Sequence, residues 1–175
     1  PTYSLAIAVI VTMSYSSIGG FSSIVRTDKF QFILMFIGFF LLIFTCYNLY
    51  GGYEFIIKNT PSYAFKIPGN FSWSFIFVWS FIALITIIDP GFYHRTFAGQ
   101  SIQNVQRSIY ISVVFWFIFD LMTISAGLYA LAILPAGTTG SPYLELSKLV
   151  LPPILQGIFM VSLFAIVMST IDSFS

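Results

Sequence analysis

The chain has 175 residues, of which 58% are hydrophobic, 19% aromatic and only 7% charged. This composition is typical of a polytopic membrane protein and excludes an ordinary soluble domain. The net charge of +1 offers no basic face for nucleic acid, so no nucleic-acid partner is expected. One cysteine and one histidine exclude a disulfide framework and a transition-metal cluster.

Five apolar segments follow one another along the chain, and each is expected to form a membrane helix. They cover residues 4–18, 30–50, 71–88, 110–134 and 149–175. The second of them holds about twenty residues without a charge, which is enough to cross roughly 30 Å of hydrocarbon. The predicted fold class is therefore all-α, a polytopic transmembrane helix bundle. Residues 1–175 are expected to be a single fragment of one transmembrane domain.

The first two segments are separated by a glycine pair and a polar stretch. Gly19 and Gly20 predict a break in the helical pattern, and residues 21–29 are expected to form a short polar connection. Asp28 follows a threonine in this connection and lies close to the predicted start of the second helix. At such a place a carboxylate caps free amides and complements the helix dipole.

The third segment is interrupted by Asp89, Pro90 and Gly91, and residues 91–99 are expected to resume as a short helix. Aspartate before proline is a good N-cap, with the proline at the first helical position. Two interpretations remain open. The break lies within the membrane, where transporters use the freed backbone groups to bind substrate. Alternatively, the membrane helix ends there and an interfacial helix begins.

Asp120 lies well inside the fourth segment. A charge at that depth costs about a few kcal/mol unless it is paired, protonated or in contact with water. We therefore expect this acid to face the protein interior or a cavity, with a partner there or in further helices of the protein. Two roles remain open for Asp120: it pairs with a residue of another helix, or it takes part in coupling transport to solute or protons.

The distribution of positive charge predicts an orientation in the membrane. The connections after the first and third segments hold Arg26, Lys29, Arg95 and Arg107, and the other two hold Lys58, Lys66 and Lys148. By the positive-inside rule the first pair of connections faces the cytoplasm, and so does the far end of the last segment. The expected location is a cell membrane crossed several times, either a bacterial inner membrane or a plasma membrane.

The last segment gathers its polar groups at its far end, where Ser169, Thr170, Asp172 and Ser173 follow an uncharged helix. In hydrocarbon such a cluster normally faces protein or a water-filled cavity. Hydroxyl and carbonyl oxygens without nitrogen or sulfur ligands suit a hard cation. The alternative is ordinary helix packing, because serine and threonine often bond back to the preceding turn of a membrane helix.

Three stretches of the chain together resemble the sodium/solute symporter family. They are residues 16–21 with 25–31, residues 89–95, and residues 151–157 followed by 168–173. Their order and spacing are similar to those of the family's core helices four to eight. The chain departs from the family at two positions, because Arg26 stands where many members have tryptophan and His94 where the family usually has glutamine.

The resemblance implies a LeuT-type inverted-repeat fold, in which five helices are followed by five more of opposite topology. It also implies roles for particular residues. Ser169 and Thr170 would bind sodium together with the Ile166 carbonyl. Asp28 and Asp172 would line the sodium exit path, so Asp28 has this second interpretation beside the helix cap.

The activity that the resemblance implies is sodium-coupled symport of a small polar organic solute by alternating access. Sodium would be the coupling ion, with no other metal and no cofactor, and Asp89 and Tyr93 are candidate solute-binding residues. The expected partners are the solute, sodium, the lipid bilayer and the remaining helices of the same protein. The alternatives are a transporter-like membrane sensor and a membrane-embedded enzyme. We expect no enzymatic activity, because the sequence shows no paired acids, nucleophile with a base, or metal-ligand set.

Overall fold

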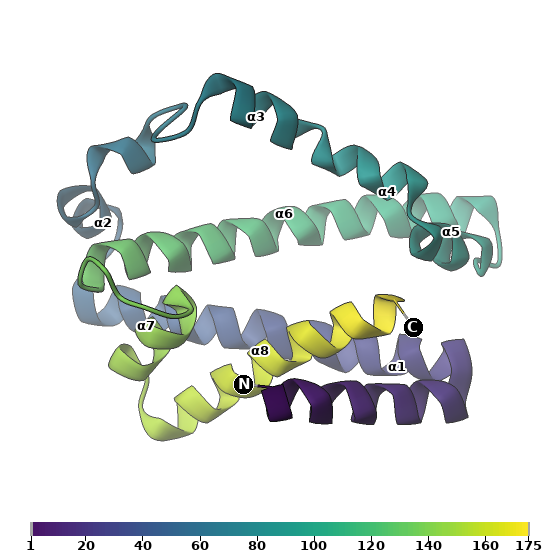
Figure 1. Ribbon diagram of the computed structural model, residues 1–175. Helices are drawn as coiled ribbons and strands as arrows, with labels where there is room; N and C mark the ends of the chain where they lie inside the picture. Colours follow the sequence, from purple (N-terminus) through teal and green to yellow (C-terminus); the bar gives the residue numbers. More distant parts are fainter. Residues whose placement is uncertain (1, 175) are drawn as a thin grey trace.

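The computed structural model describes the backbone of residues 2–174, and the side chains of all of these except 2–8, 15–16, 83, 86–87 and 173–174. Helices make up most of this part of the chain and it contains no strand (Figure 1), which confirms the all-α prediction. The elements are α1 Thr2–Tyr50, α2 Tyr53–Asn59, η1 Ser62–Phe65, α3 Trp73–Ser80, η2 Ile82–Leu84, α4 Ile85–Ile88, α5 Pro90–Phe97, α6 Ile102–Ile133, α7 Pro142–Val150 and α8 Pro153–Phe174.

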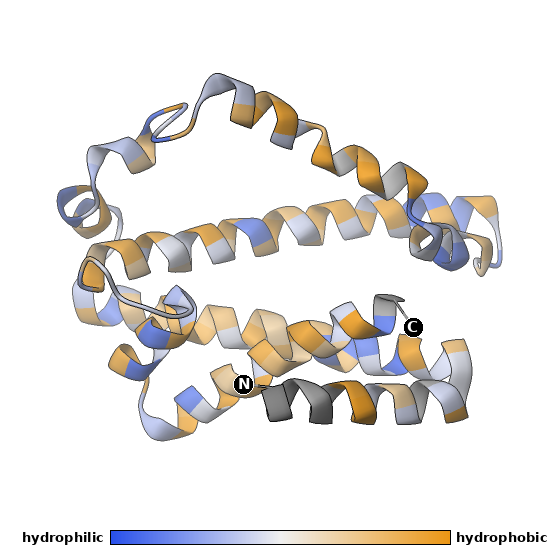
Figure 2. Cartoon of the chain, in the orientation of Figure 1, coloured by the Kyte–Doolittle hydropathy of each residue, from blue (hydrophilic) through white to orange (hydrophobic). Residues whose placement is uncertain are grey.

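Three helical stretches among the described residues are long and apolar enough to cross a membrane. They are Ser17–Tyr50, Ile102–Ile133 and Pro153–Asp172. Figure 2 shows hydrophobic residues on several sides of these helices rather than on one narrow stripe, as expected for helices that face lipid as well as protein. These stretches contain most of the second, fourth and fifth predicted segments.

The helix α1 consists of two arms that meet at Gly20, where the chain reverses its direction (Figure 1). Gly20 has φ 58° and ψ −159°, a conformation that is essentially restricted to glycine. The predicted break at Gly19 and Gly20 is therefore confirmed. The polar connection predicted at 21–29 is wrong, because charged residues do not interrupt a helix near its end and this stretch is helical. Asp28 lies about two turns inside the second arm, so it does not cap a helix start.

The third predicted segment is divided into α3, the 3-10 turn η2 and α4, and in Figure 1 it arches over α6. The predicted break at Asp89 is confirmed, since this residue is extended, with φ −74° and ψ 116°, and α5 begins at Pro90. A second interruption at Phe81 carries no glycine or proline signal. The aromatic and β-branched residues of 81–88 have only moderate helix propensity, which is too weak a bias to predict it.

The boundaries near the end of the chain differ from those predicted. The helix α6 begins at Ile102 rather than at 110, because the Ser101 hydroxyl caps it by accepting from the Asn104 amide at 3.2 Å. The stretch between the fourth and fifth predicted segments, which was expected to be a loop, contains most of α7. Pro152 and Pro153 then separate α7 from α8, since proline cannot continue a helix but fits the first position of the next one.

The hydrophobic core lies where α1, α6, α7 and α8 meet, and Phe39 of α1 is at its centre. The Phe39 ring makes edge-on contacts with Phe119 of α6, Tyr143 of α7 and Phe159 of α8, at centroid distances of 5.3, 5.3 and 5.6 Å. Such contacts add stabilisation beyond the area that they bury. One side chain therefore holds three other helices in place around α1.

Gly38 and Ser162 bring α1 and α8 into close contact. A Cβ atom at Gly38 would overlap both the Oγ and the Cβ atoms of Ser162. Ser162 is fully buried, and its hydroxyl donates to the Phe159 carbonyl at 2.7 Å. Small residues at a helix crossing let two backbones approach closely, which is how membrane helices gain packing energy.

We expect Gly38→Ala to destabilise the full-length protein, because the added methyl group must displace Ser162. Overpacking of this kind costs about 1–3 kcal/mol, and the measurement is the Tm of the purified protein in detergent. Gly157→Ala on the same α8 is the control, since a Cβ there has no atom within 4 Å. Adding Ser162→Gly to Gly38→Ala should restore part of the loss. Equal Tm values for the Gly38 and Gly157 variants would contradict this packing argument.

Candidate functional site

Asp28 of α1 connects three helices at one end of the bundle. The Ser169 hydroxyl of α8 donates to Asp28 Oδ1 at 3.1 Å, and Arg95 Nη2 of α5 lies 3.4 Å from Asp28 Oδ2. In Figure 1, α5 and the end of α8 lie at the same end, whereas α2 and α7 lie at the other. Figure 2 shows hydrophilic residues of several helices gathered at the α5 end. Two residues of the predicted sodium path, Ser169 and Asp28, are therefore in direct contact.

Burial and charge at this contact favour a cation. The Asp28 side chain is 24% exposed and that of Arg95 46%, and Asp172 of α8 is buried at 4% exposure. The carboxyl groups of Asp28 and Asp172 are close enough to interact electrostatically. When all three side chains are ionised, these three residues together carry one net negative charge. The excess of one negative charge is what a monovalent cation would compensate.

Two of the three oxygens predicted to bind sodium, those of Thr170 and Ile166, lie in contact with each other, and the sodium-binding role of the set stays a prediction. Thr170 Oγ1 donates to the Ile166 carbonyl at 2.9 Å, while the Ser169 hydroxyl points to Asp28. Thr170 is exposed, and its bond to the preceding turn is the usual arrangement of threonine in a membrane helix. The Ile166 carbonyl also accepts within the helix. A sodium ion at these atoms would require the Thr170 hydroxyl to turn away from that carbonyl.

The break before α5 has the predicted cap. Asp89 Oδ1 accepts a hydrogen bond from the Gly91 amide at 2.9 Å, and Pro90 occupies the first helical turn. Tyr93 is 41% exposed and its ring stacks on Phe97 at 6.2 Å. The break therefore sets the direction of the helix that carries Arg95 to Asp28. The proposed solute-binding roles of Asp89 and Tyr93 stay predictions.

Asp120 is exposed on α6, and its carboxyl group has no hydrogen-bonding partner within the described part of the chain. The Thr123 hydroxyl donates to its backbone carbonyl at 3.0 Å. The described bundle does not enclose this acid. The expected burial of Asp120 against an interior partner therefore stays a prediction.

Two features of this end of the bundle were missed by the sequence reasoning. From the sequence, Arg95 was considered only as a positive charge in the connection after the third segment. No sequence pattern relates it to Asp28, 67 residues away. Gln31 lies three residues after Asp28 on the same side of α1. It is 6% exposed, and its Oε1 accepts no hydrogen bond from a described residue. Burying an amide oxygen without a hydrogen bond costs free energy. The three-residue spacing from Asp28 is the sequence signal that could have identified Gln31 as part of this end of the bundle.

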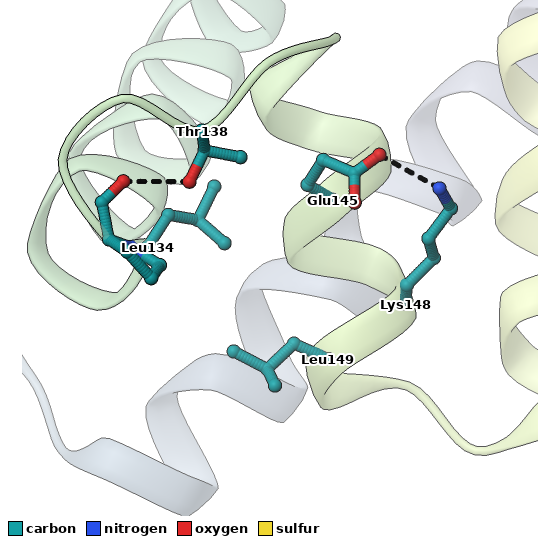
Figure 3. A pocket seen from close by; sticks show the side chains of 6 residues that line it. Leu134, Thr138, Glu145, Lys148 and Leu149 are labelled. Atoms are coloured by element: carbon teal, nitrogen blue, oxygen red, sulfur yellow. Dashed lines mark hydrogen bonds and ion pairs between the residues drawn. The ribbon is translucent and has the colours of Figure 1, made fainter.

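The hollow drawn in Figure 3 lies beside α7, at the opposite end of the bundle. It is lined by Leu134, Pro135, Thr138, Glu145, Lys148 and Leu149. Glu145 Oε1 accepts from Lys148 Nζ at 2.8 Å, and Thr138 Oγ1 donates to the Pro135 carbonyl at 2.7 Å. The two charges of this hollow are thus paired with each other, which makes it a poorer ion site than the Asp28 end.

Variants of Asp89 can distinguish its role as a helix cap from a role in binding solute through its charge. Asparagine caps a helix as well as aspartate, so we expect Asp89→Asn to keep the Tm of the full-length protein, whereas Asp89→Ala lowers stability by about 1 kcal/mol. If the carboxylate binds solute, Asp89→Asn will raise the KM for uptake. Equal Tm values for all three proteins would contradict the capping role.

These features define a polytopic α-helical membrane protein with a discontinuous segment, an architecture that secondary transporters use. The sodium:solute symporter family matches residues 2–175, and the chain belongs to this family. A sodium/pantothenate symporter of Haemophilus influenzae is 31% identical over 180 residues, which cover 98% of the chain. The chain spans 37% of the length of this relative. No solved structure matches the chain significantly. The family and the name of the relative point to a transporter rather than an enzyme.

Proposed function

We propose that the full-length protein carries out sodium-coupled uptake of a small polar organic solute by alternating access. The observation that supports this most is the contact between Ser169 and Asp28. It joins a hydroxyl of the predicted sodium pair to a carboxylate from another membrane helix. An acid held at such a place is costly unless it serves a cation or a partner group.

Sodium would bind to the hydroxyls of Ser169 and Thr170 and to the Ile166 carbonyl. A hydroxyl oxygen has two lone pairs, so each can accept sodium while its hydrogen points elsewhere. Asp28 would be the next oxygen ligand on the exit path, because it already lies 3.1 Å from the Ser169 hydroxyl. Asp172 would add negative charge to this path. Neither α1, which carries Asp28, nor α8, which carries Asp172, would have to unwind for these roles.

Sodium binding would favour the outward-open state and raise the affinity for solute, and the solute would raise the affinity for sodium by the same factor. The helix α5 would link the two sites, since Asp89 caps it and Tyr93 lies on it two residues before Arg95. The relative is named for pantothenate. Pantothenate is therefore the first solute to test, within a panel of sugars, amino acids and carboxylates.

The test of the function is uptake of labelled pantothenate and of the panel by cells that express the full-length protein. We expect uptake of at least one solute to depend on sodium and to fall to the background when potassium replaces it. Cells that express the protein but take up no solute faster in sodium than in potassium would contradict the proposal.

The sodium ligands are tested by Ser169→Ala and Thr170→Ala. Each should raise the sodium concentration for half-maximal uptake, because losing one ligand costs about 1–3 kcal/mol by analogy with a lost hydrogen-bonding partner. Expression should change little, since alanine has a high helix propensity. Ser125→Ala is the matched control: this α6 serine also bonds back to its own helix, to Leu121 at 2.7 Å. Unchanged sodium dependence in both variants would make the hydroxyl pair ordinary helix packing.

A further inference from the structure

The two oxygens of Asp28 have different partners, which lie on different helices. Oδ1 accepts from the Ser169 hydroxyl of α8, and Oδ2 faces the Arg95 guanidinium of α5. On the proposed function, Ser169 is a ligand from which sodium departs toward Asp28. Arg95 therefore already occupies the carboxylate that sodium reaches next.

Sodium and a guanidinium group both carry one positive charge, so they compete electrostatically for one carboxylate. At contact distance two like charges repel appreciably even where water screens them. The Arg95 side chain is 46% exposed, so its charge can return to water when Asp28 is taken by another cation. The Asp28 side chain is more enclosed, at 24% exposure, and gains more from keeping a cation beside it.

The helix that carries Arg95 is suited to movement. The helix α5 has no buried residue, and the chain before it bends at Asp89. By contrast, Asp28 and Ser169 belong to α1 and α8, which are locked together through Gly38 and Ser162. The helix α5 with Arg95 can therefore shift while Asp28 and Ser169 keep their positions on α1 and α8.

We propose that Arg95 is a built-in competitor of sodium for Asp28. It holds the carboxylate when sodium is absent and yields it as sodium leaves Ser169, so it promotes release of sodium at this end of the protein. This inference rests on the proposed function and adds to it a residue that sets sodium affinity and release.

The first experiment compares sodium dependence in variants of the full-length protein. Arg95→Gln should lower the sodium concentration for half-maximal uptake by about two- to fivefold, the range expected for an exposed ion pair. It should also lower the maximal rate, because sodium leaves Asp28 more slowly. Arg95→Lys retains the charge and should behave nearly as the wild type. In an Asp28→Asn background, Arg95→Gln should leave the half-saturating sodium concentration unchanged.

Arg107→Gln is the control for loss of a positive charge. Arg107 is an exposed arginine near the start of α6, and no ion pair links it to another described residue. An Arg95→Gln variant with the sodium dependence of Arg107→Gln would overturn the inference. Wild-type uptake that is independent of sodium would overturn the proposed function, and the inference with it, so the two failures are distinguishable.

A second measurement needs no variant. In the purified wild-type protein, modification of Arg95 by phenylglyoxal is followed by mass spectrometry in sodium and in potassium. We expect sodium to increase the modification of Arg95 relative to that of Arg107, because sodium frees the guanidinium from Asp28. Equal modification of Arg95 in the two salts would overturn the inference even if a variant failed to fold.

Discussion

The close approach of α1 and α8 at Gly38 and Ser162 determines how the rest of the molecule is arranged. The two helices run antiparallel, so moving back from Gly38 and forward from Ser162 leads to the same end of the bundle. With a rise of about 1.5 Å per residue, Asp28 lies about 15 Å from the crossing and Ser169 about 10 Å. The length of the side chains and the tilt of the helices bridge the difference. A larger residue at position 38 would therefore alter the register of the acid and the hydroxyl.

Two local breaks in the helices bring further parts of the chain to the α1–α8 crossing and to Asp28. Gly20 reverses the direction of α1, so that its two arms can both lie beside α8 without a long external loop. Asp89 and Pro90 end one short helix and start another, which carries Arg95 to Asp28. Each break relies on a residue that suits it: a glycine with positive φ, and an acid that caps the next helix. The long-range contacts at the site thus depend on local backbone chemistry at two distant positions.

Local rules predicted the features that depend on neighbouring residues. Gly20 and Asp89 could be identified because their conformational effects need no partner from elsewhere in the chain. The family resemblance assigned Ser169 and Asp28 to one predicted ion path, and the structure brings these two side chains into contact. Charge was a misleading guide at 21–29, because a helix that ends near the membrane surface can carry arginine, aspartate and lysine without breaking. The pairing of Arg95 with Asp28 depends on the packing of three helices, and no local pattern contains that information.

The bond between Thr170 and the Ile166 carbonyl bears on how tightly an ion can be held. A sodium ion at that carbonyl must compete with an internal hydrogen bond, whose net strength is about 0.5–1.5 kcal/mol. This competition would weaken ion binding by a factor of about two to ten. The same threonine would therefore serve as a ligand when the ion is present and as a substitute for the ion after it has left. A site built in this way favours rapid turnover over tight retention.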